Sequence, residues 1–190
     1  MKETKLKNRI FYITFLFFAA GIINISFSIL GLFCFIYPFI LFLKYKDRIW
    51  CRYFCPRSGF LSVVISKISF KLKPPKWLTG ETARQIAVYY FSVNILFIIY
   101  STVMVAIGRM YPMNYLRFFI AFIVPFRLPQ LISVNLPAFV IHFGYRIYSM
   151  MLTSVVVGSV LGIIFKPRVW CGFCPIQTLT SKKKPQKPLT

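Results

Sequence analysis

The sequence predicts an all-α integral membrane protein, and its composition and patterning both lead to that fold class. Hydrophobic residues make up 58% of the 190 residues and charged residues only 14%, against roughly 25% charged residues in a typical soluble domain. The apolar residues are gathered into long uncharged runs, and the basic residues stand at the ends of those runs. This arrangement is typical of helices that cross a lipid bilayer. The lipid bilayer is therefore an expected partner of the chain.

The first uncharged run extends from Ile10 to Leu43. One transmembrane helix needs about 20 residues, so this run predicts two short helices. The break is expected at residues 21–28, where a glycine, an asparagine and two serines interrupt the apolar residues. Residues 1–9 are basic and are expected to remain as a cytoplasmic N-terminus, because the apolar run is far longer than the core of a signal peptide.

Two further spans are predicted at residues 85–108 and 147–165. In the last span Ser154, Gly158 and Gly162 recur every four residues, which places small side chains on one helix face. Another helix could pack closely on this face. The alternative is that these small residues recur by chance and mark no packing surface.

The remaining segments are expected to be irregular or interfacial. Residues 109–146 contain four prolines, which favours a re-entrant or broken segment that is covered by protein or lines a cavity. Residues 57–73 alternate apolar with Ser and Lys positions, which indicates an amphipathic helix on the cytoplasmic surface. Residues 181–190 form a basic tail that we expect to be disordered.

The domain organisation follows from a repeated phrase. Residues 10–180 form one membrane domain, in which repeat one covers about 10–73 and repeat two about 84–180. Each repeat contains two helices followed by a short cysteine phrase, "RIWCRYFCP" from Arg48 and "RVWCGFCP" from Arg168. Both copies run through the membrane in the same direction, so an approximate two-fold axis along the membrane normal would bring the two phrases together.

Charge predicts the orientation. The chain has 24 Lys and Arg but only three acids, for a net charge of +21. Basic residues that cluster at the ends of apolar runs are membrane anchors beside anionic lipid rather than a nucleic-acid surface, so no nucleic-acid partner is expected. With four spans, twenty of the basic residues lie on one side. The four on the opposite side are Arg109, Arg117, Arg127 and Arg146.

The positive-inside rule then places both termini in the cytoplasm. The expected location is the inner membrane of a prokaryote, as a multi-pass protein with both cysteine phrases at the cytoplasmic boundary. If residues 118–141 crossed as one further helix, the two phrases would instead lie on opposite faces.

Four of the five cysteines stand in the two phrases, as Cys51-x₃-Cys55-Pro56 and Cys171-x₂-Cys174-Pro175. Cysteines at these spacings can aim two sulfurs at one centre, and two pairs supply the four thiolates of an iron–sulfur cluster or of structural zinc. The neighbouring side chains favour iron–sulfur, because arginines would offset the cluster's negative charge and aromatic rings would exclude water. The arginines are Arg48, Arg52, Arg57 and Arg168, and the aromatic residues are Trp50, Tyr53, Phe54, Trp170 and Phe173.

The two phrases resemble those of the NapH/NosR-type membrane iron–sulfur proteins, in which Trp-Cys-x₃-Cys-Pro occurs twice, often after an arginine. "YPMNYLRFF" from Tyr111 also resembles the segment between their phrases. The resemblance covers about residues 30–180. It implies a [4Fe–4S] cluster held by Cys51, Cys55, Cys171 and Cys174, and electron transfer between quinone and a soluble electron carrier or redox enzyme subunit.

Two features depart from that family. The second phrase has two residues between its cysteines rather than three, and the chain carries neither a ferredoxin-like domain nor a flavin domain. The chain therefore resembles a short form, an electron-transfer subunit rather than a self-contained enzyme. Arg48, Trp50, Arg168 and Trp170 are expected beside the cluster, which one chain closes or two chains share as a homodimer.

Two alternative functions remain at this stage. "CGFC" from Cys171 is typical of a redox dithiol, so the chain could be a membrane thiol–disulfide oxidoreductase, although such enzymes act on the oxidising side of the membrane. A zinc-stapled membrane scaffold would use the same four thiolates. Cys34 is expected to be a buried filler well away from the other four, and His142 a packed residue rather than a quinone ligand.

Overall fold

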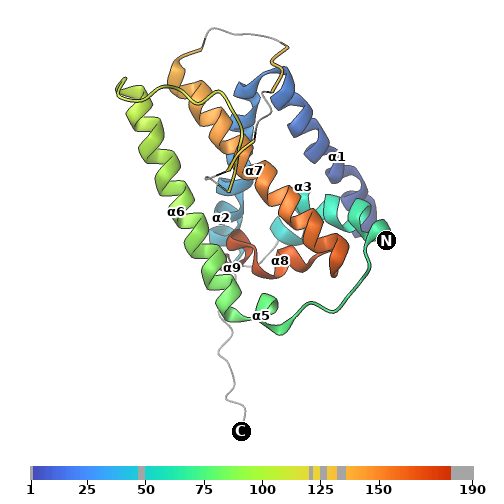
Figure 1. Ribbon diagram of the computed structural model, residues 1–190. Helices are drawn as coiled ribbons and strands as arrows, with labels where there is room; N and C mark the ends of the chain where they lie inside the picture. The colour runs from blue at the N-terminus through green and yellow to red at the C-terminus, as the bar shows by residue number, and fades with distance from the viewer. Residues whose placement is uncertain (1, 47–49, 120–121, 125–127, 132–135, 181–190) are drawn as a thin grey trace.

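The computed structural model describes residues 2–46, 50–119, 122–124, 128–131 and 136–180, and the fold is mostly helical (Figure 1). The basic tail 181–190 and Arg48 lie outside the described residues. The helices and strands are α1 (Lys2–Ile23), the 3₁₀ helix η1 (Ile25–Leu32), α2 (Phe33–Tyr45), the π-helical turn η2 (Trp50–Phe54), α3 (Pro56–Phe60), the π-helical turn η3 (Leu61–Ile65), α4 (Ser66–Ile68), α5 (Lys76–Thr79), α6 (Glu81–Ala106), β1 (Arg117–Phe118), β2 (Phe122–Ile123), α7 (Ala138–Ile164), α8 (Val169–Phe173) and α9 (Pro175–Leu179).

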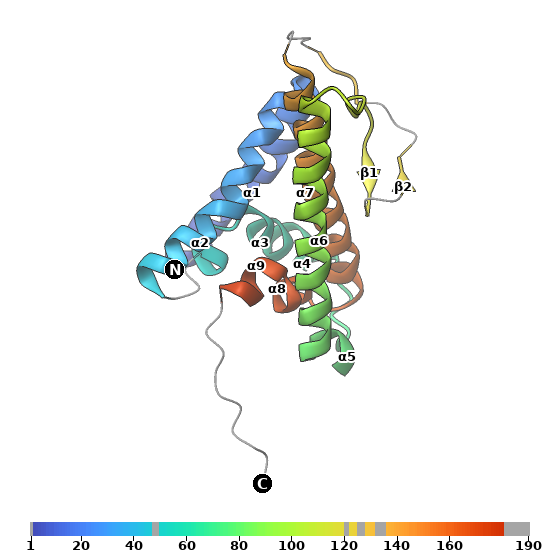
Figure 2. The same cartoon turned by 90° about the vertical axis from the view of Figure 1, so that its left-hand side faces the viewer.

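The long helices run up and down along one direction. In Figures 1 and 2, α1 rises from the N-terminus, η1 and α2 return beside it, α6 rises again and α7 descends. The short helices α3, α8 and α9 lie together towards the end where α1 and α6 begin, and the two strands lie towards the other end. The segments that contain the two cysteine phrases are therefore neighbours in space.

The predicted break in the first apolar run is present. Asn24 has extended backbone between α1 and η1, and its side chain accepts a hydrogen bond from the Ser26 backbone N–H at 2.8 Å. A short polar side chain that binds its own backbone in this way ends one helix and starts the next. The returning chain packs on α7 at Gly144, where a Cβ atom would lie only 2.8 Å from the Ile25 carbonyl oxygen.

Three of the described helical segments are long and apolar enough to cross a membrane: residues 25–45, 81–106 and 138–164. These correspond to three of the four predicted spans. The fourth, residues 10–23, is apolar but shorter, because α1 devotes its first eight residues to the basic N-terminal segment. By length and composition alone, the structure therefore has three candidate spans rather than four.

The prediction for residues 109–146 needs two corrections. Residues from Ala138 onward are helical, so the last long helix begins nine residues before the predicted Ile147. Pro137 directly precedes this helix and is compatible with its start, since proline's fixed φ suits an N-terminal boundary. The chain is also not entirely α, because β1 and β2 form a two-stranded antiparallel ribbon. The described part of the stretch between Arg109 and Pro137 is otherwise irregular, as the prolines indicate.

The predicted amphipathic helix forms over residues 56–68, as α3, η3 and α4. It is shorter than expected and is partly enclosed by protein, since Leu61 and Ile65 are 2% and 4% exposed. These two residues meet the small-residue face of α7: a Cβ at Gly158 would lie 3.5 Å from Leu61, and one at Gly162 would lie 2.9 Å from Ile65. The small face therefore does receive a helix at close range, and that helix leads directly out of the first cysteine phrase.

Candidate functional site

The two cysteine phrases fold into the same local arrangement. In each, a single helical turn, η2 or α8, leads to a cysteine in extended conformation at the N-cap of a short helix that begins with proline. Cys55 precedes Pro56 in α3, and Cys174 precedes Pro175 in α9. Proline suits the first helical position because the N–H that it lacks would have no partner within the helix. The Cys-Pro pair thus fixes where each second cysteine stands.

All four cysteines line one small cavity. Cys51 and Cys55 reach it from the first phrase, and Cys171 and Cys174 from the second. The cavity has a volume of about 20 Å³, which is room for about one water molecule. Segments 120 residues apart in the sequence therefore meet at one cavity.

The two tryptophans of the phrases border the same cavity. Trp50 stacks on Phe54 with ring centroids 6.3 Å apart and packs on Tyr37 at 5.4 Å. Trp170 packs edge-on against Phe173 at 5.1 Å. These rings limit contact between the thiols and water, and all four cysteines are half-buried. Both tryptophans therefore lie beside the four cysteines, and their role at a cofactor stays a prediction.

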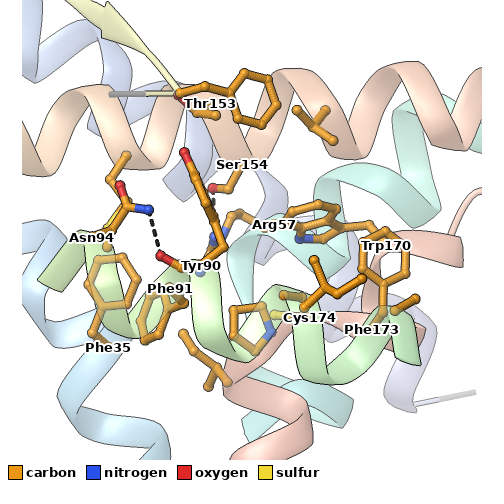
Figure 3. Close-up of a pocket in the computed structure, with 18 of the residues that line it drawn as sticks. Phe35, Arg57, Tyr90, Phe91, Asn94, Thr153, Ser154, Trp170, Phe173 and Cys174 are labelled. Atoms are coloured by element: carbon orange, nitrogen blue, oxygen red, sulfur yellow. Dashed lines mark hydrogen bonds between the residues drawn. The ribbon is translucent and has the colours of Figure 1, made fainter. Parts of the chain in front are cut away.

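Arg57 is the cation most closely associated with the cysteines. Its Nη1 atom donates a hydrogen bond of 2.7 Å to Ser154 on α7, and its guanidinium lies 5.9 Å from the Phe35 ring (Figure 3). Burial lowers the pKa of Arg57, but the negative charge that Cys55 and Cys174 carry when deprotonated acts in the opposite direction, and the net pKa is raised. A permanently positive group is thus held beside the four sulfurs.

The predicted arginines differ in what they contribute. Arg168 is exposed, and its charge lowers the pKa of Cys171 against the larger effect of burial. The sequence placed Arg57 among several arginines that would offset charge but did not distinguish it. The position of Arg57 in the sequence does not indicate that it is held beside the cysteines, because this placement depends on Ser154, which lies 97 residues away.

Burial raises the pKa of three thiols at the site. Burial first, and then the neighbouring cysteines, raise the pKa of Cys51 to about 12. Burial also raises the pKa of Cys171 and of Cys174, although Arg57 opposes the shift at Cys174. Without a metal these thiols are protonated at neutral pH, so a metal would have to displace protons in order to bind.

The residues fit a metal centre in chemistry but not in spacing. Four cysteines are the ligand set of zinc or of an iron–sulfur cluster. Among the described residues, however, no three metal-ligating side chains converge closely enough to hold an ion. The cavity is also far smaller than a four-iron cluster, so the side chains around it would have to move outward to admit one.

Cys34 and His142 complete the predicted candidates. Cys34 lies closer to the site than expected, because it packs on the same hydrophobic cluster as Cys174 and is near enough to Arg57 and Cys55 to interact electrostatically with both. His142 is 1% exposed; its Nδ1 accepts from the Met113 backbone N–H at 3.1 Å and its Nε2 lies 3.0 Å from the Ser101 hydroxyl. His142 is therefore a packed residue that joins α6, α7 and the loop between them.

A second, much larger cavity begins beside the cysteines. It has a volume of about 880 Å³, lies between α6 and α7, and is lined mostly by apolar side chains. Figure 3 shows Trp170, Cys174 and Arg57 on one part of its wall, with Phe91 and Asn94 of α6 on another. The sequence did not predict this cavity, whose described walls come from six separate stretches of the chain.

Comparison with family models, with curated proteins and with solved structures finds no match to this chain.

Proposed function

We propose that the protein is a membrane electron-transfer protein that carries a [4Fe–4S] cluster on Cys51, Cys55, Cys171 and Cys174. The observation that carries the proposal is the meeting of these four side chains, from two phrases 120 residues apart, on one cavity wall. When bound, such a cluster supplies one-electron transfer. Cysteines placed only for packing would not need to converge from two repeats, nor to be followed in both by proline at a helix start.

The protein's own residues have separate tasks in this proposal. The four cysteines hold the centre, Arg57 offsets its negative charge, and Trp50 and Trp170 exclude water. The guanidinium of Arg57 is itself held by a hydrogen bond of 2.7 Å to Ser154, so its positive charge stays in a fixed position beside the cysteines. The larger cavity, which reaches Cys174, would let an apolar carrier such as a quinone approach the site from the membrane.

The proposed topology has four membrane passes in two parallel repeats, with α1 as the shortest pass. Both cysteine phrases and both termini then lie in the cytoplasm of a prokaryote, since twenty of the 24 basic residues lie on that side. The basic cytoplasmic face would attract an acidic soluble electron carrier or redox subunit. Labelling of Cys51 or Cys171 by an impermeant thiol reagent from outside intact spheroplasts would contradict this orientation.

A zinc-stapled membrane scaffold is the second candidate, and the size of the thiol cavity favours it. A space of about 20 Å³ is closer to the needs of one ion with sulfur ligands at about 2.3 Å than to those of a four-iron cluster. In this alternative the four thiolates join the two repeats and carry no electrons.

Metal analysis of the intact protein separates these proposals. We expect anaerobically purified protein to hold about four irons and four sulfides per cluster, with an EPR signal after reduction. Changing any one of the four cysteines to serine should lower that content, whereas Cys34→Ser, a matched change at a nearby half-buried cysteine, should not.

The other outcomes are equally distinct. Stoichiometric zinc without sulfide would replace the electron-transfer proposal by the scaffold. Protein without either metal, but with a reversible disulfide within a cysteine pair, would contradict both and leave the dithiol oxidoreductase.

A further inference from the structure

The end of the large cavity away from the cysteines contains two arginines, Arg146 on α7 and Arg117 on β1. They are close enough for their charges to repel each other. Arg117 donates from Nη2 to the Tyr115 hydroxyl at 2.8 Å, and its backbone N–H donates to Ser149. Two positive charges are therefore held together beside an apolar space, where burial of a charge is costly.

Arg146 is the less satisfied of the two. Its side chain is 5% exposed, and its buried Nε has no hydrogen-bond partner among the residues that the structure describes. Its guanidinium lies 4.8 Å from the Phe97 ring, which also lines the cavity. The ring contact stabilises the cation but leaves the Nε–H without an acceptor.

The chain has little means of supplying the missing anion. Its three acids are Glu3, Asp47 and Glu81, and the 109 residues after Glu81 contain none. Glu81 begins α6 at the cysteine end of the molecule and lies 3.4 Å from Arg84 (Figure 1). No carboxylate of the described residues therefore pairs with Arg146, which makes an anion from outside the chain the natural partner.

The position of Arg146 indicates where that anion comes from. The 27 residues of α7 extend over about 40 Å, against a hydrocarbon core of about 30 Å. Arg146 is eight residues from the start of α7, which is about 12 Å along its axis. Counted back about 20 residues from Ile164, where α7 ends before Lys166, the hydrocarbon core ends near residue 145. Arg146 thus lies near the far membrane boundary, within reach of lipid phosphate groups. From there the apolar cavity continues along α6 and α7 past Ser154, two helical turns further on.

We propose that the cavity binds an anionic phospholipid, whose phosphate lies against Arg146 and Arg117 and whose acyl chain occupies the apolar space between α6 and α7. A free phosphate ion would satisfy the arginines but would leave about 880 Å³ of mainly apolar cavity unfilled. A neutral lipid would fill that space without neutralising the charge. The proposal does not depend on the metal centre at the other end.

The test uses full-length protein, freed of lipid and quinone in detergent, because a quinone would share the apolar part of the cavity. Binding of phosphatidylglycerol and of diacylglycerol, a neutral lipid without phosphate, with the same acyl chains is measured by native mass spectrometry and tryptophan fluorescence. We expect the anionic lipid to bind at least about tenfold more tightly, as a charge-assisted hydrogen bond implies. Arg146→Gln should remove most of this preference.

Arg109→Gln is the matched control, since Arg109 lies at the same end, is exposed and does not line the cavity. This variant should keep the preference. If Arg146→Gln does not fold, Val157→Phe provides a second test: it narrows the apolar part of the cavity, keeps both arginines, and should weaken binding of both lipids.

Three results would overturn the proposal. One is equal affinity of the wild-type protein for the two lipids. Another is an equal fluorescence response to inorganic phosphate alone, which would make the site one for a free anion. The third is a preference that survives in folded Arg146→Gln, or lipid binding that is unchanged in Val157→Phe.

Discussion

The hydrogen bond between Arg57 and Ser154 joins the two halves of the cysteine site, so its removal is a direct test of the structure. Arg57 follows the first cysteine phrase, and Ser154 lies on α7, the helix that leads into the second. The 2.7 Å bond between them has a charged donor. Ser154→Ala removes the acceptor and leaves part of a half-buried guanidinium without a partner.

The expected cost can be worked from this geometry. Hydrogen bonds to charged groups contribute about 1.5–3 kcal/mol, and the Phe35 ring at 5.9 Å remains to hold the cation. We therefore expect Ser154→Ala to lower the free energy of unfolding by about 1.5–3 kcal/mol, measured by SDS titration in mixed micelles. The thiols should also react more slowly with a maleimide, because the thiolate is the reactive form and Arg57, whose charge lowers the pKa of Cys174, is no longer fixed beside it.

Ser159→Ala is the matched control on the same helix. Ser154 donates to the Met151 carbonyl, and Ser159 makes the equivalent bond to the Val155 carbonyl, but no arginine bond of Ser159 is found among the described residues. This change should cost no more than about 0.5 kcal/mol. A double-mutant cycle with Arg57→Met should give a coupling energy of about 1 kcal/mol or more. Equal effects of the two serine changes, with no coupling to Arg57, would refute the reasoning.

Three further predictions concern packing and protonation. Gly162→Ala should destabilise the protein by about 1–3 kcal/mol, because its Cβ would lie 2.9 Å from Ile65, whereas Gly172→Ala, with no atom within 4 Å, should not; equal unfolding free energies would contradict this. His142→Leu should cost about 2–4 kcal/mol, since it removes two buried hydrogen bonds, without changing the metal content, and loss of metal in folded protein would contradict a purely packing role. Metal-free protein should lose stability as pH rises from 9 towards 12, because the raised pKa of Cys51 keeps this thiol neutral in the folded state while it ionises in the unfolded state. The loss of stability should be smaller in Cys51→Ser. Identical pH profiles for the wild-type protein and this variant would contradict the prediction.

The sequence predicted those features that depend on local chemistry. The break at Asn24 follows from one polar side chain that binds its own backbone. The spans predicted at residues 85–108 and 147–165 follow from uninterrupted apolar composition, and long helices are found there. The small-residue face of α7 was also readable, because its spacing of four residues repeats on one side of a helix. Each of these signals lies within one short stretch of the chain.

The features that were missed depend on contacts between distant segments. The start of α7 at Ala138 was not predicted because Gly144, Arg146 and His142 interrupt the apolar pattern, yet each is accommodated by a neighbouring element. Arg57 gained its distinct role only through Ser154. The large cavity likewise has no sequence signature, since it is the space left between α6 and α7.

Three residues separate the two cysteines of the first phrase, and two residues separate those of the second. The local helical geometry of each phrase accommodates this difference. In the first phrase the turn is π-helical, and the Cys55 N–H donates to the Trp50 carbonyl five residues earlier at 2.9 Å. In the second phrase the turn is tighter, and the Cys171 N–H donates to Arg168 only three residues earlier. A π turn holds one more residue than an α turn, so the extra residue widens the turn instead of rotating the cysteines apart.

The chain then continues in the same way from both phrases. The carbonyl of Cys55 accepts from Gly59, and that of Cys174 accepts from Thr178, each four residues on. Each phrase therefore delivers two cysteines to one side of its turn and starts the next helix at the same point. The missing residue in the second phrase, which departs from the spacing of the first, does not by itself argue against a shared four-thiolate site. Single π turns are frequent at functional sites, and this one lets two phrases of different length face the same cavity.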